Sequence, residues 1–455
     1  MRRILSSLLL IIGLTITSYA QWTSPGNGTT YTLPDLVTVT DGIVTNSANV
    51  FTIHADLTIS ESDVLMIDNQ VARIDAPGIL ITINGSMTCT NTERVKLYGT
   101  ETNPFSMRFE NARGCNINKM YFSDGAGIKV IESDVTFNDV KFVYFTRDYS
   151  TAVIDIFNCN PEINGCYFML NQGPAISSPA NGQASPKILN CEFDTNVNGI
   201  NSPQINLGPG GRDTIYIVGN EIYTIMASWY VGGISVADLM GVGSTKVLLK
   251  DNIIREGRYG YNQQGQTISS VITGNRFINN NHEDNPMNGG SGISIYGSST
   301  DNKAVLRNNV ITGNLWGITA IYFHDIDMGT EDDWGHNEIH DNGNSGMIYD
   351  LYNNSGCDLM AVGNDWGSTD PERIEDHIFH QHDDSTLGLV TFIPYIGGNV
   401  ELDEVVIDPQ QIDPTTMTLF SITGQRVNTS SLMPGVYIAV MKQGTQTIAK
   451  KIIIQ

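Results

Sequence analysis

The feature that most constrains this chain is a nine-residue pattern that recurs along it. Each copy has an aliphatic residue, two variable residues, a turn residue, one variable residue and an anchor, Phe or Ile, often followed by Asn three residues later. Clear copies are Ile163–Asn171, Ile188–Asn196, Ile272–Asn280 and Leu306–Asn314, and weaker ones centre on Phe122, Phe142, Ile222, Ile254, Ile339 and Trp366. The ten anchors lie 20 to 34 residues apart. This spacing predicts a solenoid, in which each coil packs on its neighbours.

The turn position, two residues before each anchor, indicates how the coils are held together. Six consecutive copies place Asn there: Asn220, Asn252, Asn275, Asn309, Asn337 and Asn364. Asn tolerates a tight turn, and its amide can bond to the Asn one coil away. We therefore expect a structural Asn ladder rather than a ligand site. Cys166 and Cys191 hold this position in two earlier copies, and we expect stacked thiols, with a disulfide as the alternative.

Short strands follow most anchors and alternate with period two. In Gly127–Val130, Gly233–Val236 and Gly292–Ile295 the isoleucines should point inward, whereas Lys129, Ser235 and Ser294 should point outward. Strands of three to five residues, with no run of helical period, argue against a TIM barrel or a helical solenoid. The residues before 115 fit the same scheme, with strands expected at 57–59, 64–67, 79–83 and 95–97.

The first twenty residues predict export. Arg2 and Arg3 precede an apolar stretch, and Ser18-Tyr19-Ala20 places small residues where a signal peptidase cuts. The apolar run is too short to anchor a mature protein, and no later segment is long enough to span a membrane.

The charge of the chain is concentrated in its middle. Six of the 25 Lys and Arg residues lie in segments 1–20 and 414–455, whereas all 48 Asp and Glu residues lie between these segments. A surface this acidic repels nucleic acid and anionic lipid headgroups, and so we expect neither as a partner.

The closing part of the repeat has a recognisable ending. Asn364-Asp-Trp-Gly367, Asp370-Pro371 and Val390-Thr-Phe-Ile-Pro394 resemble a terminal segment of bacterial β-helix repeat proteins. Asp370 can cap a helix that begins at Pro371, with Ile374 and Ile378 four apart on one face. We expect residues 364–395 to form a closing cap. His377, His380 and His382 lie in it, and their spacing does not suggest tetrahedral ligation, so we expect surface histidines.

The repeat as a whole resembles the right-handed parallel β-helix superfamily typified by pectate lyases. The resemblance implies an all-β right-handed parallel β-helix solenoid of about 10 to 13 rungs over residues 21–395.

The C-terminal residues form a different module. Residues 396–413 have no periodicity and are expected to be a linker, after which residues 414–455 alternate as strands. The turn Thr423-Gly424, the motif Pro434-Gly435-Val436-Tyr437 and the pair Lys450-Lys451 resemble the type A C-terminal sorting domain of type IX secretion cargo from Bacteroidetes. The resemblance implies a small β-sandwich-like domain that engages the type IX secretion machinery. It also implies passage through the periplasm to the outer cell surface or the medium.

The lyase resemblance implies where chemistry would lie. In those enzymes acidic residues in a groove on one strand face hold calcium, and an Arg or Lys abstracts a proton beside a uronate carboxylate. Arg255 and Arg258 are the best-placed basic residues, and Asp155 is a candidate acid on a neighbouring rung. These three are our candidate catalytic residues.

A second candidate site lies in an insert from His324 to Trp334 that breaks the repeat rhythm. Asp325 and Asp327 alternate, and a glycine and further carboxylates follow, including Glu331. Oxygen ligands in this arrangement can hold Ca²⁺. The alternative is a solvated acidic loop without a metal.

Three functions remain open. The first is a secreted or cell-surface β-helix that binds glycans or host or matrix macromolecules without catalysis. The second is a polysaccharide lyase or glycoside hydrolase acting on a uronate-containing polysaccharide. The third is a structural surface-layer component. The fold cannot decide between them, because function depends on sites grafted onto it.

Overall fold

The computed structural model describes residues 21–197, 201–224, 230–241, 244–283, 290–344 and 347–397. Of the C-terminal part it describes 405–406, 417–421, 426–428, 432, 434–443 and 446–454. The predicted signal peptide, 1–20, lies outside the described residues, as does the Thr423-Gly424 turn. The chain divides into two compact units, Met1–Ile396 and Gly397–Gln455.

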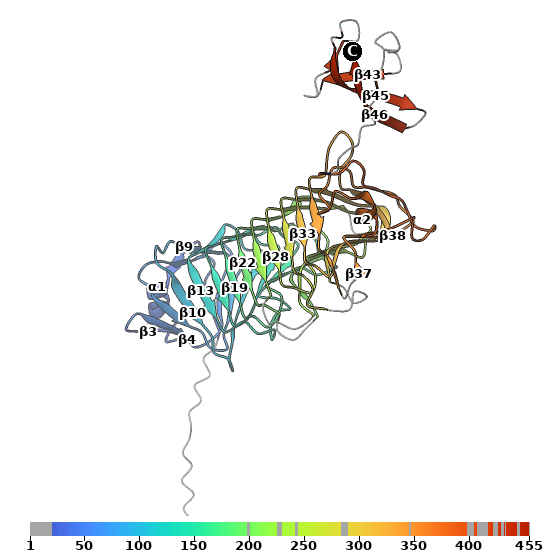
Figure 1. The fold of residues 1–455 in the computed structure, drawn as a ribbon. Helices are drawn as coiled ribbons and strands as arrows, with labels where there is room; N and C mark the ends of the chain where they lie inside the picture. Colours follow the sequence, from blue (N-terminus) through green and yellow to red (C-terminus); the bar gives the residue numbers. More distant parts are fainter. Residues whose placement is uncertain are drawn as a thin grey trace, which may run out of the picture. The chain divides into compact units, whose positions relative to one another are not determined.

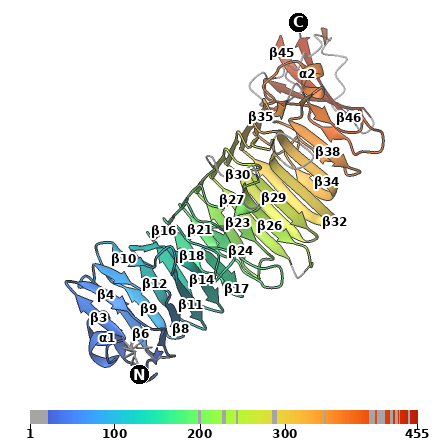
Figure 2. The same ribbon diagram turned by 90° about the horizontal axis from the view of Figure 1, so that it is seen from below.

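The first unit is a right-handed parallel β-helix, as predicted, in which each coil contributes a strand to each of three faces (Figure 1). Sheet 1 is seen along the β-helix in Figure 2. Its strands are β1 (Trp22–Thr23), β5 (Leu57–Ile59), β8 (Leu80–Ile83), β11 (Phe105–Glu110), β14 (Gly125–Ile131), β17 (Ile154–Phe157), β20 (Ile176–Ser177), β23 (Pro203–Leu207), β26 (Gly232–Asp238), β29 (Tyr261–Gly265), β32 (Ser291–Arg307), β34 (Trp316–Asp327), β38 (Leu351–Ser355) and β40 (Ile378–Phe379).

Sheet 2 follows sheet 1 in each coil, and β32 and β34 are long enough to run through both. Its other strands are β2 (Thr30–Thr32), β6 (Val64–Ile67), β9 (Ser86–Cys89), β12 (Cys115–Asn118), β15 (Val135–Asn138), β18 (Glu162–Asn164), β21 (Lys187–Leu189), β24 (Thr214–Val218), β27 (Thr245–Lys250), β30 (Ile268–Thr273), β39 (Leu359–Met360) and β41 (Val390–Thr391).

Sheet 3 carries nine of the ten anchors, all except Trp366, and has 13 strands. They are β3 (Val44–Ser47), β4 (Val50–Ile53), β7 (Arg73–Asp75), β10 (Val95–Tyr98), β13 (Met120–Ser123), β16 (Lys141–Val143), β19 (Tyr167–Met169), β22 (Glu192–Asp194), β25 (Glu221–Tyr223), β28 (Ile253–Arg255), β31 (Arg276–Ile278), β33 (Val310–Thr312) and β35 (Glu338–His340). All pairs are parallel except β3 with β4. A small antiparallel pair, β36 (Gly343–Asn344) and β37 (Met347–Ile348), lies outside the three sheets.

The anchors form the core, as the pattern predicts. All ten are buried with at most 2% of their surface exposed. Phe142, Phe168 and Phe193 stack face to face, with ring centroids 4.7 and 5.0 Å apart. The inward isoleucines Ile128, Ile234 and Ile293 are fully buried. Burying one such side chain contributes about 1.5–3 kcal/mol, and the repeat adds this at every coil.

The predicted Asn ladder is confirmed. The Oδ1 atom of Asn275 accepts hydrogen bonds from the backbone N–H and the Nδ2 of Asn252, at 3.0 and 2.8 Å, and the same pattern joins each pair up to Asn364. Cys191 N–H donates to Asn220, and so the ladder continues into the cysteine positions. Cys166 and Cys191 are free thiols on adjacent coils.

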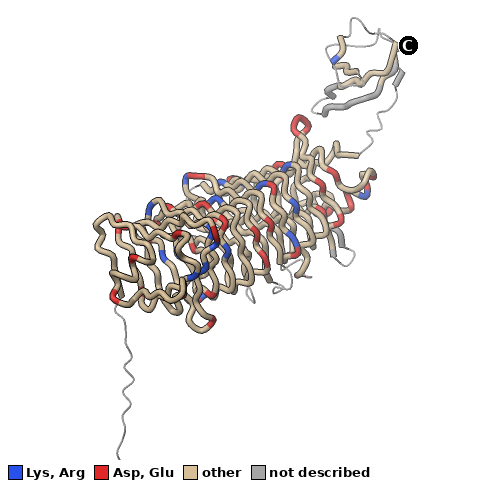
Figure 3. The backbone as a smooth tube through the Cα atoms, turned by 90° about the vertical axis from the view of Figure 1, so that its left-hand side faces the viewer, with Lys and Arg blue, Asp and Glu red and all other residues tan. Residues whose placement is uncertain are grey.

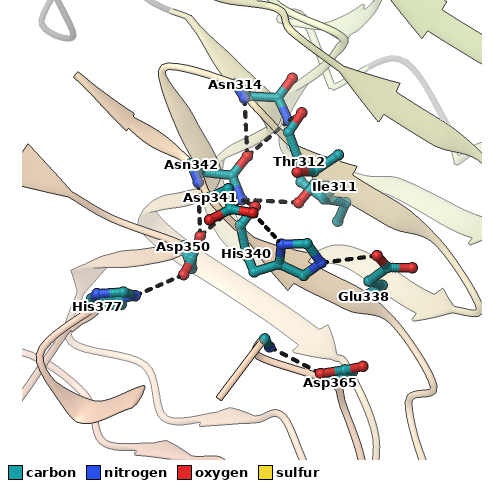
Figure 4. A network of polar contacts seen from close by, with 11 residues as sticks. Ile311, Thr312, Asn314, Glu338, His340, Asp341, Asn342, Asp350, Asp365 and His377 are labelled. Carbon is teal, nitrogen blue, oxygen red and sulfur yellow. Dashed lines mark hydrogen bonds and ion pairs between the residues drawn. The ribbon is translucent and has the colours of Figure 1, made fainter. Parts of the chain in front are cut away.

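A second ladder uses the Asn three residues after the anchor. Asn280, Asn314 and Asn342 are fully buried and bond in sequence, and Asn342 donates to the carboxylate of Asp350 at 2.9 Å. Asp350 in turn contacts His377 Nδ1 at 3.1 Å (Figure 4). The ladder therefore ends on a buried carboxylate paired with a histidine of the closing cap.

Both ends of the β-helix are covered. α1 (Leu33–Val39) begins at a capping box formed by Thr32 and Asp35 and buries Leu33 and Leu36. α2 (Pro371–Glu375) begins at Asp370, whose side chain accepts from the N–H of Glu372, as predicted. One detail of the prediction is wrong: the helix ends at Glu375, so Ile378 is buried from strand β40 rather than from the helix.

The second unit is a five-stranded sheet in the order β42-β46-β45-β43-β44. Its strands are β42 (Val405–Val406), β43 (Met417–Ser421), β44 (Arg426–Val427), β45 (Gly435–Gln443) and β46 (Gln446–Ile454). Leu419, Ala439, Ile452 and Ile454 form its own small core. Val405 and Val406, which the sequence places in a linker, pair with β46. No helix in the described part of the chain is both long and apolar enough to cross a membrane.

Candidate functional site

The outward face of sheet 1 presents one polar side chain per coil in a continuous register. Backbone pairing places these residues directly over one another: Asp155, Ser177, Asn206, Ser235, Asn262, Ser294 and Thr319. We call this set the polar column. Period-two alternation produces it, because the residues on either side of each member point into the core. Ser177, Ser235 and Thr319 are at most 7% exposed, so their hydroxyls are recessed, whereas Asn206 stands out into solvent.

One end of the polar column lies in a pocket of about 430 Å³. Asp155, Ser177 and Asn206 line it together with apolar residues that include Pro179, Ala237 and Leu239. A pocket with a few placed polar groups and an apolar wall is the usual form of a small-molecule or sugar subsite. We call it the Asp155 pocket.

The Asp155 carboxylate is held by hydroxyl groups. Ser177 Oγ donates to it at 2.7 Å, and Thr151 Oγ1 lies at 3.3 Å from it and 3.2 Å from Ser177 Oγ. These short bonds fix the carboxylate at the edge of the pocket. The carboxylate can accept hydrogen bonds from a ligand hydroxyl. The side-chain amide of Asn206 can both donate and accept them.

Catalysis by this pocket would need more groups than its lining contains. Glycoside hydrolysis uses two carboxylic acids across the scissile bond, and Asp155 is the only acid among the described residues that line the pocket. Proton abstraction needs a base, and the neighbouring cation in register is Lys129, one coil away. Its Nζ lies 4.3 Å from the ring centre of Tyr149. This arrangement favours hydrogen-bonding recognition.

The three candidate catalytic residues are not brought together. Arg255 ends β28 on sheet 3, a different face from Asp155 on β17. Its guanidinium bonds to Glu221 at 2.7 Å and lies 3.9 Å from the ring centre of Tyr223. The hydrogen bond that Arg255 donates to the Glu221 carboxylate raises the pKa of Arg255 above its usual range, so the guanidinium stays a cation. Arg258 follows β28 and donates to Asn201 at 2.7 Å.

The candidate calcium ligands lie apart from one another. Asp325 pairs with Lys303 at 3.0 Å, Asp327 pairs with Arg307 at 2.8 Å, and Glu331 is exposed between β34 and β35. The predicted loop is shorter than expected, because β34 continues through Asp327. Arg307 also binds Asp333, so cations already neutralise two of these carboxylates. Calcium binding by this segment stays a prediction.

The closing cap contains a cluster that the sequence did not predict. Glu375, His380 and His382 place one ligand atom each within 4.8 Å of one another. His380 is fully buried, contrary to the expected surface histidine, and its Nε2 contacts Glu375 at 2.7 Å. His382 contacts the same carboxylate oxygen.

The tautomer of His380 argues against a metal at this cluster. Its Nδ1 accepts the backbone N–H of Val390 at 2.9 Å, so the ring proton must lie on Nε2. A metal at Nε2 would push that proton onto Nδ1, against the Val390 N–H. We conclude that the cluster is a hydrogen-bonded network that ties α2 to the last coil. Burial would raise the pKa of Glu375, but the two histidines hold it below its usual value.

An aromatic cluster covers the other end of the sheet 1 face. Thr319 pairs in register with Tyr352, and Tyr352 with Phe379, so aromatic residues continue the polar column. Trp316 stacks on Tyr352, and Tyr352 on Phe379, with ring centres 4.7 and 4.8 Å apart, and Tyr349 packs edge-on against all three. We call these four residues the aromatic cluster. The repeat pattern gave no signal for it, because the strands that carry Tyr352 and Phe379 follow two of the weaker copies, around Ile339 and Trp366.

Comparison with known proteins gives a partial family match and a match of fold. Residues 249–373 match the family model described as "Protein of unknown function (DUF1565)". No curated protein matches the chain. Among solved structures, one mutant of the periplasmic alginate epimerase AlgG is similar over 80% of this chain and 83% of its own, with 13% identity and a TM-score of 0.50. A second AlgG mutant has 15% identity and a TM-score of 0.47, over 80% and 82% of the two chains. At this identity the first likeness shows a shared fold, the parallel β-helix.

Proposed function

We propose that this protein is an exported polysaccharide-binding protein that holds a glycan against the outward face of sheet 1 without cleaving it. The observation that carries the proposal is the polar column, seven hydroxyl, amide or carboxylate side chains in unbroken register. Stacked strands lie about 4.8 Å apart, close to the length of one sugar ring in a linear chain. The exposed and half-buried members, Asp155, Asn206, Asn262 and Ser294, can therefore offer hydrogen-bonding groups to the sugars of one chain.

The Asp155 pocket supports the same proposal. Sugars combine polar hydroxyls with apolar ring faces, and the pocket combines Asp155 and Asn206 with the apolar side chains of Pro179 and Leu239. The AlgG structure is that of an alginate epimerase, and we extend to this chain only the idea that such a fold can serve a polysaccharide.

The alternative function is a polysaccharide lyase or glycoside hydrolase acting on a uronate-containing polysaccharide. One observation favours it: Lys129 and Asp155, a possible base and acid, are neighbours in register on sheet 1. In that case the active site would not include the other candidate residues, namely Arg255, Arg258 and the candidate calcium ligands Asp325, Asp327 and Glu331.

Destination is the second part of the proposal. We infer that residues 414–455 form a type IX sorting domain and that residues 1–20 are a signal peptide. The protein would then cross the periplasm and be released or attached at the outer cell surface. The compactness of Gly397–Gln455, with its own core, supports a separate sorting unit.

The test is affinity electrophoresis of the mature full-length chain in gels that contain neutral or uronate-bearing linear polysaccharides. We expect retardation by at least one polysaccharide, and reduced retardation for Asp155→Ala and Asn206→Ala. Asn181→Ala is the control, because Asn181 is exposed and lies outside the Asp155 pocket. Reducing ends and unsaturated products are measured on the same samples. Product formation that Asp155→Ala abolishes would replace this proposal with the enzymatic alternative.

A further inference from the structure

The aromatic cluster and the Asp155 pocket lie at opposite ends of one surface. From Asp155 to Tyr352 the backbone register advances seven coils. At about 4.8 Å per coil the two features are about 34 Å apart along sheet 1. A monosaccharide or disaccharide could not reach both.

The aromatic cluster differs from the other ring stack of this protein in its exposure. Phe142, Phe168 and Phe193 stack inside the core and are fully buried, so packing alone explains them. Trp316, Tyr352 and Phe379 stack on the outside of sheet 1 and remain partly exposed. Aromatic side chains with one polar tip, such as Tyr352 and Tyr349, are suited to ligands that are apolar on one side and hydroxylated on another. A sugar chain has this character.

Between the two features, the described members of the polar column are uncharged. The members of the polar column from Ser177 to Thr319 are serine, threonine or asparagine. Asn262 Nδ2 donates to Ser235 Oγ at 3.1 Å, and Ser291 and Thr319 share a bond of 2.6 Å, so these groups are ordered in place. Asp155, at the far end, is an anion. A chain that bears a carboxylate or sulfate on every unit would meet the negative charge of Asp155 and no compensating cation among the described column members.

We propose that the ligand is a neutral, linear glycan that lies parallel to the solenoid axis and contacts the Asp155 pocket and the aromatic cluster at the same time. This inference rests on the proposed glycan binding. It adds the ligand's charge, its orientation and a minimum length, which is about eight sugar units if each unit advances about one coil. Two linked contacts act as a bivalent site, so the second contact strengthens binding only for chains that reach it.

The experiment measures the dissociation constants of the full mature chain for cello-, xylo- and manno-oligosaccharides from dimers to decamers by calorimetry, with oligomannuronates as charged counterparts. We expect affinity to rise steeply where chains become long enough to span about seven coils. Trp316→Ala and Tyr352→Ala should each weaken decamer binding about tenfold. Tyr121→Ala is the matched control, because Tyr121 lies on sheet 3 in a partly exposed aromatic pair with Tyr98. Circular dichroism and melting temperature confirm that each variant folds.

The outcomes separate the two proposals. If no polysaccharide binds in the electrophoresis test, glycan binding itself is wrong. If a glycan binds but its affinity levels off at two to three units and is unchanged in both aromatic variants, the Asp155 pocket acts alone and the long-chain inference is overturned. Tighter binding of oligomannuronates than of neutral chains of equal length would overturn the inferred charge.

Discussion

At the residue scale, hydrogen bonds between buried Asn side chains link each coil to the next, as disulfide bonds link segments in a smaller protein. Each ladder Asn fills a turn that backbone groups alone would leave unsatisfied, and its Nδ2 also reaches a backbone carbonyl, as Asn275 does with Leu249 at 2.8 Å. A buried donor without a partner costs about 1–3 kcal/mol. The ladder is therefore sensitive to any single loss, because each amide satisfies its neighbour as well as its own coil.

Replacing Asn275 by alanine tests this dependence. The change removes the acceptor for two donors of Asn252 and leaves them buried. We expect a loss of about 2–4 kcal/mol in the free energy of unfolding, measured by chemical denaturation. Asn103→Ala, at an exposed asparagine, should change stability by less than about 0.5 kcal/mol. Equal effects of the two substitutions would contradict a structural ladder.

His324 gives the solenoid a dependence on pH. It is buried, and its Nε2 contacts Ser355 Oγ at 2.8 Å, whereas its Nδ1 has no hydrogen-bond partner among the described residues. Burial lowers its pKa below the usual value of 6.5. As pH falls, the unfolded chain therefore takes up the proton first. The stability that this residue contributes is complete above about pH 6.5 and is lost below it.

The test compares melting temperatures of the protein and of His324→Asn between about pH 7.5 and pH 5. The unmodified protein should lose more stability over this range than the variant, in which Asn can hydrogen-bond as the ladder residues do. His336→Asn, at an exposed histidine, is the control and should behave like the unmodified protein. An identical pH profile for all three proteins would show that His324 does not titrate as its burial requires.

Single residues also show why the site was harder to predict than the fold. The roles of Asn275 in the ladder and of Phe168 in the core can be predicted from the residue types, because turn and core positions tolerate few side chains. Asp155, by contrast, is a candidate acid in the sequence, but nothing near it in the sequence indicates the pocket that it lines with Asn206 and Leu239, which lie on later coils. The sequence position of Arg255 suggested a catalytic role, but the coil geometry places this residue on sheet 3, away from Asp155 on sheet 1.

At the scale of elements, the ends of the solenoid carry its main vulnerability. A terminal coil exposes core side chains and unpaired strand edges unless another element covers them. The cap of residues 364–395 was predicted because Asp370-Pro371 is a strong helix start. Helix α1 was not predicted, although Thr32 and Asp35 form a capping box, because Pro34 and the β-branched Val37 and Val39 hide the helical period.

Weakening α1 should open the first coils. Leu36→Ala removes a fully buried side chain and should cost about 2–5 kcal/mol. We expect faster hydrogen exchange in β2 and β6, which α1 contacts, and little change in the middle coils. Val39→Ala, at an exposed position of the same helix, is the control. Uniform exchange along the β-helix would indicate that α1 is not a local cap.

At the scale of the whole molecule, we propose that the β-helix serves glycan binding and that the second compact unit serves delivery. Acidic residues and fewer basic ones are spread along the β-helix (Figure 3), which keeps it soluble and disfavours polyanions. The long, regular surface of sheet 1 comes from the repetition of one coil, and so the polar column follows once the repeat is known. The aromatic cluster at the end of the polar column could not be predicted from the sequence, because the last coils depart from the repeat pattern.

Removing residues 397–455 tests whether the β-helix binds glycan independently of the proposed sorting unit. The β-helix has its own core and both of its caps, so the truncated protein should keep its melting temperature and its glycan binding. In a bacterium that has type IX machinery, the full chain should reach the cell surface or the medium, whereas the truncated chain should accumulate in the periplasm. Surface delivery of the truncated chain would contradict a sorting role for this unit.

Hydroxyl-radical footprinting of the full mature chain, with and without a bound neutral decamer, tests most directly whether sheet 1 holds a glycan. We expect Trp316, Tyr352 and Phe379 on sheet 1 to become protected, whereas Tyr98 and Tyr121 on sheet 3 remain equally reactive, with no cleavage of the decamer. Protection confined to sheet 3, or a decamer recovered in shorter pieces, would contradict the claim that sheet 1 holds a glycan without cutting it.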